Sequence, residues 1–219
     1  TMHARAVLPT SSSTNWASMI MGAGPEQHGI TSNAWERDNL TLPAVTQSEP
    51  FLFPSIFHLI REQRTSEKIG AIYHWGGFGR LFEKNAVDFD ENPATEEETA
   101  VNASSYIKVE KPLFMFVHFD HIDHAGHEFG HGTKEYYHAV EKADSLLAEI
   151  MKAITESGMA DNTMVIISSD HGGKGKGHGG ESMEEIEIPF ILWGKGIKKD
   201  YRIKYPVYQY DNAATVAHA

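Results

Sequence analysis

Short apolar segments separated by helical patterns constrain the fold of this chain more than any other feature. Two of them, residues 113–119 and 163–169, are almost continuously apolar, which is typical of strands buried on both faces of a sheet. Between them, residues 134–157 carry apolar side chains at spacings of three and four, which indicates a helix with one core-facing side that ends at Gly158. Further strands are predicted at 68–75 and 188–193. This alternation predicts an α/β fold with a mainly parallel central sheet and helices on both faces.

The size and composition of the chain agree with a single compact domain over residues 1–219. Apolar residues make up 41% of the sequence and charged residues 22%, which is ordinary for a globular protein. A chain of this length can bury a substantial core. Three more helices are predicted, at residues 15–21, 54–64 and 95–107.

Charge and composition exclude several classes of function. The formal net charge is −11, and a surface of that sign repels phosphate backbones, which argues against general nucleic-acid binding. The sequence contains no cysteine, so disulfides, thiolate metal sites and cysteine nucleophiles are excluded. No apolar run approaches the 18 or so residues of a membrane span, and the first residues show no signal-peptide pattern.

Polar clusters follow the two most apolar strands, where ligands bind in parallel sheets. Asp170 and His171 follow one strand, and the glycine-rich segment 172–180 can return His178 to the same place. Asp123 and His127 follow the other strand and are four residues apart, so one helical turn aims both at one point. Oxygen and imidazole ligands without thiolate suit zinc, with manganese or iron as poorer matches. The alternatives are hydrogen-bonded loops, a pH-sensitive surface or an opportunistic metal site.

A run of hydroxyl residues, 10–14, precedes the helix predicted at 15–21. One interpretation is an N-cap, which explains one or two of these hydroxyls but not five in a row. The other is a nucleophile, because a metal can lower the pKa of a hydroxyl and a helix N-terminus favours a bound phosphate. Asn33 lies in the following loop, where its amide can donate to a phosphoryl oxygen.

Together these segments resemble the alkaline phosphatase superfamily, most closely its nucleotide pyrophosphatase/phosphodiesterase branch, with a second likeness to the GPI ethanolamine-phosphate transferases. The motifs that carry the resemblance are Pro9-Thr10-Ser11-Ser12, the loop from Gly24 to Asn33, Asp123-x-x-Gly126-His127 and Ser169-Asp170-His171-Gly172. His178, in Gly177-His178-Gly179-Gly180, is similar to the transferase arrangement.

The resemblance implies a hydrolase of small phosphoesters that uses two divalent metal ions, with Zn²⁺ the best match and Mn²⁺ an alternative. Ser12 is then the nucleophile and passes through a phosphoseryl intermediate, while Asn33 and the backbone N–H of Ser13 bind the substrate phosphate. One metal ion would be held by Ser12, Asp170 and His171, and the other by Asp123, His127 and His178.

The same resemblance implies a further aspartate on a first strand ahead of the nucleophile, and no acidic residue precedes Ser12. We therefore expect the chain to lack the first strand and the C-terminal end of such a domain. Relatives of this type act outside the cytoplasm, which predicts an extracytoplasmic (periplasmic or secreted) location.

Other functions remain open on the sequence alone. A phosphomonoesterase is expected to use an arginine, which Arg5 or Arg80 could supply; a phosphoryl-group transferase and a non-catalytic zinc-binding domain are further alternatives. A sulfatase needs Cys/Ser-x-Pro-x-Arg at the nucleophile, and Ser12-Ser13-Thr14-Asn15-Trp16 has neither the proline nor the arginine. The leaving group, the oligomeric state and the metal identity are not indicated.

Overall fold

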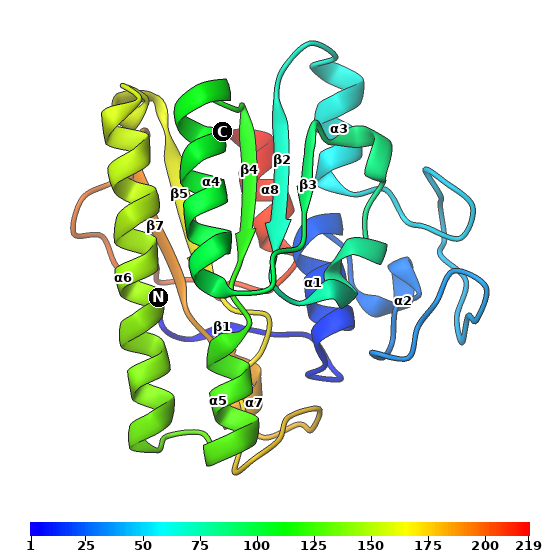
Figure 1. Cartoon of the computed structure of the whole chain (residues 1–219). Helices are drawn as coiled ribbons and strands as arrows, with labels where there is room; N and C mark the ends of the chain where they lie inside the picture. The colour runs from blue at the N-terminus through cyan, green and yellow to red at the C-terminus, as the bar shows by residue number, and fades with distance from the viewer.

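The computed structural model describes residues 1–219 and contains a parallel sheet with helices on both faces (Figure 1). In this sheet β2 (Ile69–Tyr73) lies between β3 (Phe89–Glu91) and β4 (Phe114–His118), and all three strands are parallel. Two antiparallel pairs complete the strands: β5 (Met164–Ser168) with β7 (Phe190–Gly194), and β1 (Ala4–Arg5) with β6 (Glu187–Ile188).

Helices cover both faces of this arrangement. On one face lie α4 (Glu96–Glu110) and α6 (Lys134–Glu156), and on the other α1 (Ser12–Met21), α3 (Ile56–Gln63) and α8 (Asp211–His218) (Figure 1). The shorter helices are α2 (Pro25–His28), α5 (His121–Phe129), α7 (Met183–Ile186), η1 (Gly76–Arg80), η2 (Lys84–Ala86) and η3 (Ala160–Asn162). The predicted α/β class with a parallel sheet is confirmed, and every predicted helix is present.

The predicted strand over 188–193 is corrected in two ways. Pro189 has no N–H to donate to a ladder, and the chain divides there into β6 and β7. In addition, β7 is antiparallel to β5. The connection from β5 to β7 holds only the four-residue α7 and no long crossover helix, so the chain turns back along β5.

The prediction that residues 113–119 and 163–169 form strands buried on both faces is only partly met. β2 is buried throughout, whereas β5 and most of β4 are half-buried. β4 pairs only with β2, and β5 pairs only with β7, so each has one edge without a neighbouring strand. The missing neighbour explains the higher exposure of their side chains.

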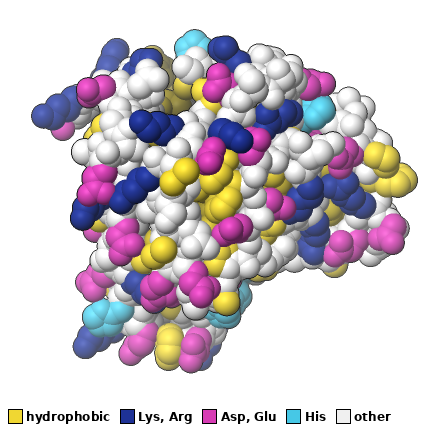
Figure 2. Space-filling view, turned by 45° about the horizontal axis from the view of Figure 1, so that its top comes forward, with side chains coloured by type: hydrophobic (Ala, Val, Ile, Leu, Met, Phe, Trp, Pro, Cys, Tyr) yellow, Lys and Arg dark blue, Asp and Glu magenta, His cyan; other side chains and the backbone are white.

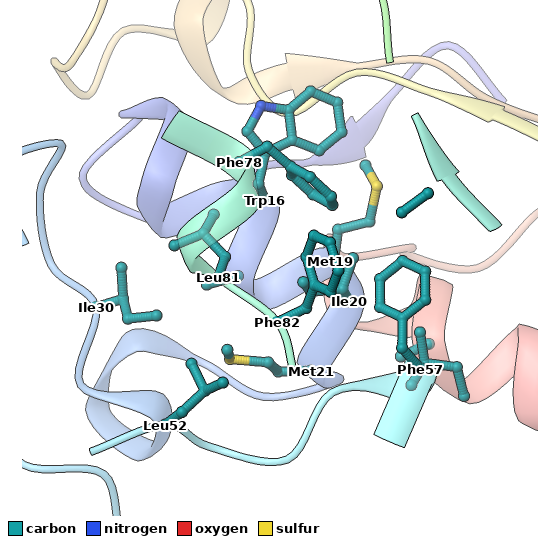
Figure 3. Packing of buried hydrophobic residues seen from close by; sticks show 14 of the residues in the cluster. Trp16, Met19, Ile20, Met21, Ile30, Leu52, Phe57, Phe78, Leu81 and Phe82 are labelled. Carbon is teal, nitrogen blue, oxygen red and sulfur yellow. The ribbon is translucent and has the colours of Figure 1, made fainter. Parts of the chain in front are cut away.

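The larger core fixes α1 against the sheet. Trp16, Met19, Ile20 and Met21 of α1 are buried together with Phe78, Leu81 and Phe82 from the segment after β2 (Figure 3). Within this core the rings of Phe78 and Phe116 stack with centroids 4.5 Å apart, and Trp16 meets Phe116 edge-on at 5.7 Å. A smaller core of Ile72, Ala103, Ile107, Ile150, Ala153 and Ile154 joins the sheet to α4 and α6. This packing sets where the N-terminal turn of α1 lies.

The surface carries charges of both signs. Figure 2 shows acidic and basic side chains interspersed over one face, without an extended basic region. None of the helices combines the length and apolar character that crossing a membrane requires.

His28 gives the fold a measurable sensitivity to acid. Its Nδ1 accepts the Ile30 N–H at 3.0 Å, so the neutral ring carries its proton on Nε2, which lies 2.9 Å from Ser18 Oγ. Burial lowers the pKa of His28 to about 3. A lowered histidine pKa stabilises the fold fully above the unfolded value near 6.5, and that stability is lost as the pH falls towards 3.

We therefore expect His28→Asn to be less stable than the parent at pH 7, with a difference that shrinks by about 2 kcal/mol at pH 5, at ~1.4 kcal/mol per pH unit below 6.5. Urea unfolding at pH 7, 6 and 5 measures this. His138→Asn is the matched control, because His138 is exposed and contacts only Glu141. A stability difference that is independent of pH would contradict this role of His28.

Candidate functional site

The N-terminal turn of α1 has no side-chain cap, and the buried side chain of Asn15 fixes the loop before it. Ser11 is the N-cap but its side chain makes no capping bond, so the N–H groups of this turn receive no partner from the N-cap. The Asn15 amide binds the preceding loop instead: its Oδ1 accepts the Val7 N–H at 2.8 Å, and its Nδ2 lies 3.1 Å from both the Pro9 and the Ser11 carbonyl oxygens. Ser12 is thereby fixed as the first residue of the helix.

Asp123, His127 and His178 come together although they belong to distant segments. One ligand atom from each lies within 4.8 Å of the others. His127 Nε2 is 3.2 Å from Asp123 Oδ2, across one turn of α5, and His178 Nε2 is 3.8 Å from Asp123 Oδ1. The i, i+4 spacing on α5 places the first pair, and the glycine-rich loop after β5 brings the third residue.

Ser12, Asp170 and His171 form a second group beside the first. His171 Nε2 lies 3.2 Å from Ser12 Oγ and 3.1 Å from Asp170 Oδ2. The His171 and His178 rings stack with centroids 3.8 Å apart, which joins the two groups. The structure thus brings together all six side chains that the sequence predicted as metal ligands.

The three histidines of the site share one hydrogen-bonding pattern. Each Nδ1 faces a backbone carbonyl oxygen: His127 that of Lys176 at 2.9 Å, His171 that of Gly172 at 2.8 Å and His178 that of Thr10 at 2.9 Å. A carbonyl oxygen only accepts, so each Nδ1 carries a hydrogen, and the lone pair of each neutral ring lies on Nε2.

These lone pairs point at the carboxylates of Asp123 and Asp170. A lone pair facing a carboxylate is repulsive unless a proton or a metal cation lies between them. Histidines that donate Nδ1–H to a carbonyl and offer Nε2 are the usual form of a metal ligand. The donor set therefore fits divalent metal ions.

The electrostatics of the site lead to the same conclusion. Burial and the nearby Asp123 carboxylate raise the pKa of Asp170 to about 8. Burial also lowers the pKa of His171, and burial together with its neighbour His171 lowers the pKa of His178. The protein alone disfavours both a charged Asp170 and charged imidazoles, whereas a cation stabilises the carboxylate and binds neutral histidines.

Thr10 and Glu185 anchor the loop that carries His178. Thr10 Oγ1 donates to the Gly180 carbonyl at 2.7 Å and accepts the Gly179 N–H at 3.0 Å. Glu185 accepts the Gly180 N–H at 2.8 Å. Gly172 is required where this loop leaves β5, because a Cβ there would lie 2.1 Å from the Glu184 carbonyl oxygen. Thr10 lies within the hydroxyl run, whereas the sequence marks Glu185 only as the last residue of a Ser-x-x-Glu capping box that begins at Ser182.

Asn33 lies beside the start of α1, but its side chain binds the Ser13 N–H, which the sequence did not predict. The Ser13 backbone N–H donates to Asn33 Oδ1 at 2.7 Å. In this structure the N–H is therefore bonded to Asn33 rather than turned towards a ligand. Asn33 itself is exposed, and its Nδ2 has no protein acceptor.

The remaining histidines near the site have other surroundings. His118 is buried against the Trp16 ring, with centroids 4.7 Å apart. His121 packs with Nε2 3.0 Å from the Ala139 carbonyl oxygen, and His131 Nδ1 lies 3.0 Å from that of Gly175. His124 is exposed, with Nδ1 3.8 Å from Asp120 Oδ2.

Comparison with known proteins places the chain in a family. Residues 1–177 match the family of type I phosphodiesterases / nucleotide pyrophosphatases. The chain belongs to this family. Its curated relatives include venom phosphodiesterase of Macrovipera lebetinus, 26% identical over 184 residues, which are 77% of this chain and 21% of that protein. GPI ethanolamine phosphate transferase 1 of Homo sapiens is 32% identical over 115 residues, which are 51% of this chain and 12% of that protein. The chain thus spans about a fifth or less of the length of these relatives.

Solved structures with a similar fold include family members and other enzymes. Murine ectonucleotide pyrophosphatase / phosphodiesterase 5 aligns with a TM-score of 0.61 at 19% identity, over 78% of this chain and 48% of that one. A 2-O GAG sulfatase aligns with a TM-score of 0.68 at 16% identity, over 97% of this chain and 62% of that one. At these identities the likeness concerns the fold alone, which is that of the alkaline phosphatase superfamily.

Proposed function

We propose that this protein is a metal-dependent phosphodiesterase that hydrolyses small phosphoesters through a phosphoseryl intermediate on Ser12. The observation that carries the proposal is the convergence of three imidazole Nε2 atoms on the carboxylates of Asp123 and Asp170, with Ser12 Oγ 3.2 Å from His171 Nε2. Membership of the phosphodiesterase family supports the reaction class.

Ser12, Asp170 and His171 would hold one metal ion, and Asp123, His127 and His178 the other. Oxygen and nitrogen donors without sulfur favour Zn²⁺, with Mn²⁺ as the alternative. Bound divalent ions neutralise charge on the phosphoryl group and lower the pKa of an adjacent hydroxyl.

The chain supplies the nucleophile and the positioning. Ser12 Oγ attacks phosphorus, the P–Oγ bond forms, the bond to the first alcohol breaks and that alcohol leaves with the Ser12 proton, so the second alcohol stays esterified to phosphorus on Ser12. Water then breaks the P–Oγ bond, which releases a phosphate monoester and restores the Ser12 hydroxyl. Asn33 Nδ2 is free to donate to a non-bridging oxygen, while the Ser13 N–H orients the Asn33 amide. The N-terminus of α1 favours the phosphoryl charge, and such positioning accounts for much of the rate in phosphoryl transfer.

A diester substrate fits the arginines of this structure better than a monoester. A monoester dianion is usually met by a free guanidinium. Arg80 is bound to Ser13, Asn33 and Glu36, and Arg5 to Glu187 and Met183. Both arginines that could reach the nucleophile are therefore already bonded to protein groups.

Phosphoryl-group transfer to an alcohol is the second candidate. The similarity to human GPI ethanolamine phosphate transferase 1 and the position of His178 in the loop after β5 favour it. A monoesterase and a non-catalytic zinc-binding domain are the remaining alternatives. The extracytoplasmic location and the single domain over residues 1–219 stay predictions; the similarity to a venom phosphodiesterase supports the former.

Turnover before and after metal removal tests the function. We expect bis(p-nitrophenyl) phosphate to be hydrolysed faster than p-nitrophenyl phosphate, and p-nitrophenyl sulfate not at all. We expect a chelator to abolish turnover and Zn²⁺ to restore it, because the charges of the site need a cation. Two bound zinc ions per chain without turnover would support the binding domain. Transfer of the p-nitrophenyl phosphoryl group to added glycerol in preference to water would support the transferase.

A further inference from the structure

Arg80 joins the segments that present the proposed phosphate-binding groups. It is the last residue of η1, which follows the carboxyl end of β2. Its Nη2 donates to Ser13 Oγ at 3.0 Å and to the Asn33 carbonyl oxygen at 2.6 Å. One nitrogen thus connects the first turn of α1 with the loop that carries Asn33.

The rest of the guanidinium also lies against protein groups, with 25% of the side chain exposed. Nη1 donates to Glu36 at 2.9 Å, Nε is buried without a partner, and Cζ lies 6.0 Å from the centre of the Trp75 ring. The positive charge is offset by Glu36, and both hydrogens of Nη2 are used. This environment suits a group that organises the protein and leaves little of the guanidinium free for a substrate dianion.

Arg80 and Ser13 both form hydrogen bonds that hold Asn33 against the start of α1. The Ser13 N–H fixes the Asn33 side chain through Oδ1, and Arg80 fixes the Asn33 main chain and the Ser13 side chain. Asn33 is otherwise exposed, so without Arg80 only the hydrogen bond from the Ser13 N–H would hold Asn33 against α1. The loop that carries Asn33 would then move relative to α1. A displacement of about 1 Å in a positioning group can cost roughly 10²-fold in rate.

We propose that Arg80 is a positioning residue that holds the Asn33 amide against the N-terminal turn of α1, in register with Ser12. The proposal rests on the proposed function, because it gives Asn33 a substrate phosphate to bind. It assigns Arg80 an indirect role, which distinguishes it from the arginine that a monoesterase uses to bind its substrate.

The first test needs no substrate. Hydrogen exchange of the Ser13 amide reports its bond to Asn33, and we expect exchange to be faster in both Arg80→Ala and Asn33→Ala. Arg37→Ala is the matched control: Arg37 lies in the same loop region but donates its hydrogen bonds to Glu49 and the Phe82 carbonyl oxygen, and none to α1. Unchanged protection in Arg80→Ala would overturn the proposal, whether or not the protein is a diesterase.

The second test uses turnover of bis(p-nitrophenyl) phosphate. We expect Arg80→Ala to lower kcat by roughly 10- to 10²-fold with a smaller change in KM, and Arg80→Lys to recover part of the loss. In an Asn33→Ala background the same change should add little, because both act on one group. Additive losses, or a rise in KM confined to p-nitrophenyl phosphate, would make Arg80 a direct substrate ligand and refute the indirect role. Absence of turnover in the parent would refute the proposed function, with the exchange result still deciding the role of Arg80.

Discussion

Replacing Ser12 by alanine is expected to lower the turnover of bis(p-nitrophenyl) phosphate by at least about 10³-fold, because it removes the proposed attacking atom. Ser12 Oγ is the hydroxyl at the start of α1 that lies within 3.2 Å of His171 Nε2. The side chain makes no other hydrogen bond that would support the fold, so the variant should unfold at the same urea concentration as the parent. Initial rates with zinc-loaded protein measure the loss.

Ser11→Ala is the matched control for this experiment. Ser11 precedes the proposed nucleophile, and its Oγ contacts only Thr14 Oγ1, at 2.8 Å. We expect this variant to keep its activity, and Ser12→Thr to retain measurable turnover because it keeps a hydroxyl at the same place. A p-nitrophenyl phosphate group trapped on the protein by acid quenching should appear in the parent and be absent from Ser12→Ala. Undiminished turnover in Ser12→Ala would refute the assignment of the nucleophile.

Local sequence patterns predicted the parts of the structure that depend on neighbouring residues. The spacing of Asp123 and His127 predicted one helical turn, and α5 supplies it. The apolar runs predicted β4 and β5, so Asp170 and Asp123 follow strand ends as the sequence indicated. The glycines after β5 predicted a tight loop that could return His178, although not the Thr10 carbonyl that orients its ring.

The features that the sequence did not predict depend on contacts between distant segments. Arg80 is 67 residues from Ser13, and no local pattern links them. The antiparallel β5–β7 pair depends on how the chain turns after the glycine-rich loop that follows β5. Strand propensity does not predict this turn. The family resemblance implied that the Ser13 N–H binds the substrate phosphate. Whether this N–H is free depends on where Asn33 folds back, which no local pattern predicts.

The Asp123→Asn variant should show whether Asp123 binds metal or instead stabilises the fold. The Asp123 carboxylate lies close to both His127 and His178, so it is next to both other proposed ligands of that metal ion. We expect the variant to bind one zinc ion instead of two and to lose roughly 10²-fold or more in turnover, since loss of even an outer partner of a metal site costs 10- to 100-fold. Zinc content after gel filtration and initial rates measure both effects. Glu128→Gln, an exposed change on the same helix, should alter neither.

In the presence of a chelator the same substitution should cost no stability. Burial and the Asp123 charge raise the pKa of Asp170 to about 8, so in the metal-free site the ionisation of Asp170 beside Asp123 is disfavoured near neutral pH. An amide at position 123 removes that repulsion, so the metal-free variant should melt no lower than the metal-free parent. With Zn²⁺ at about 100 times its Kd the parent gains about 2.7 kcal/mol per site, and the variant gains this at one site only. A chelated variant that melts well below the parent would mean that Asp123 stabilises the fold itself. The close approach of Asp123 to His127 and His178 would then need no metal to explain it.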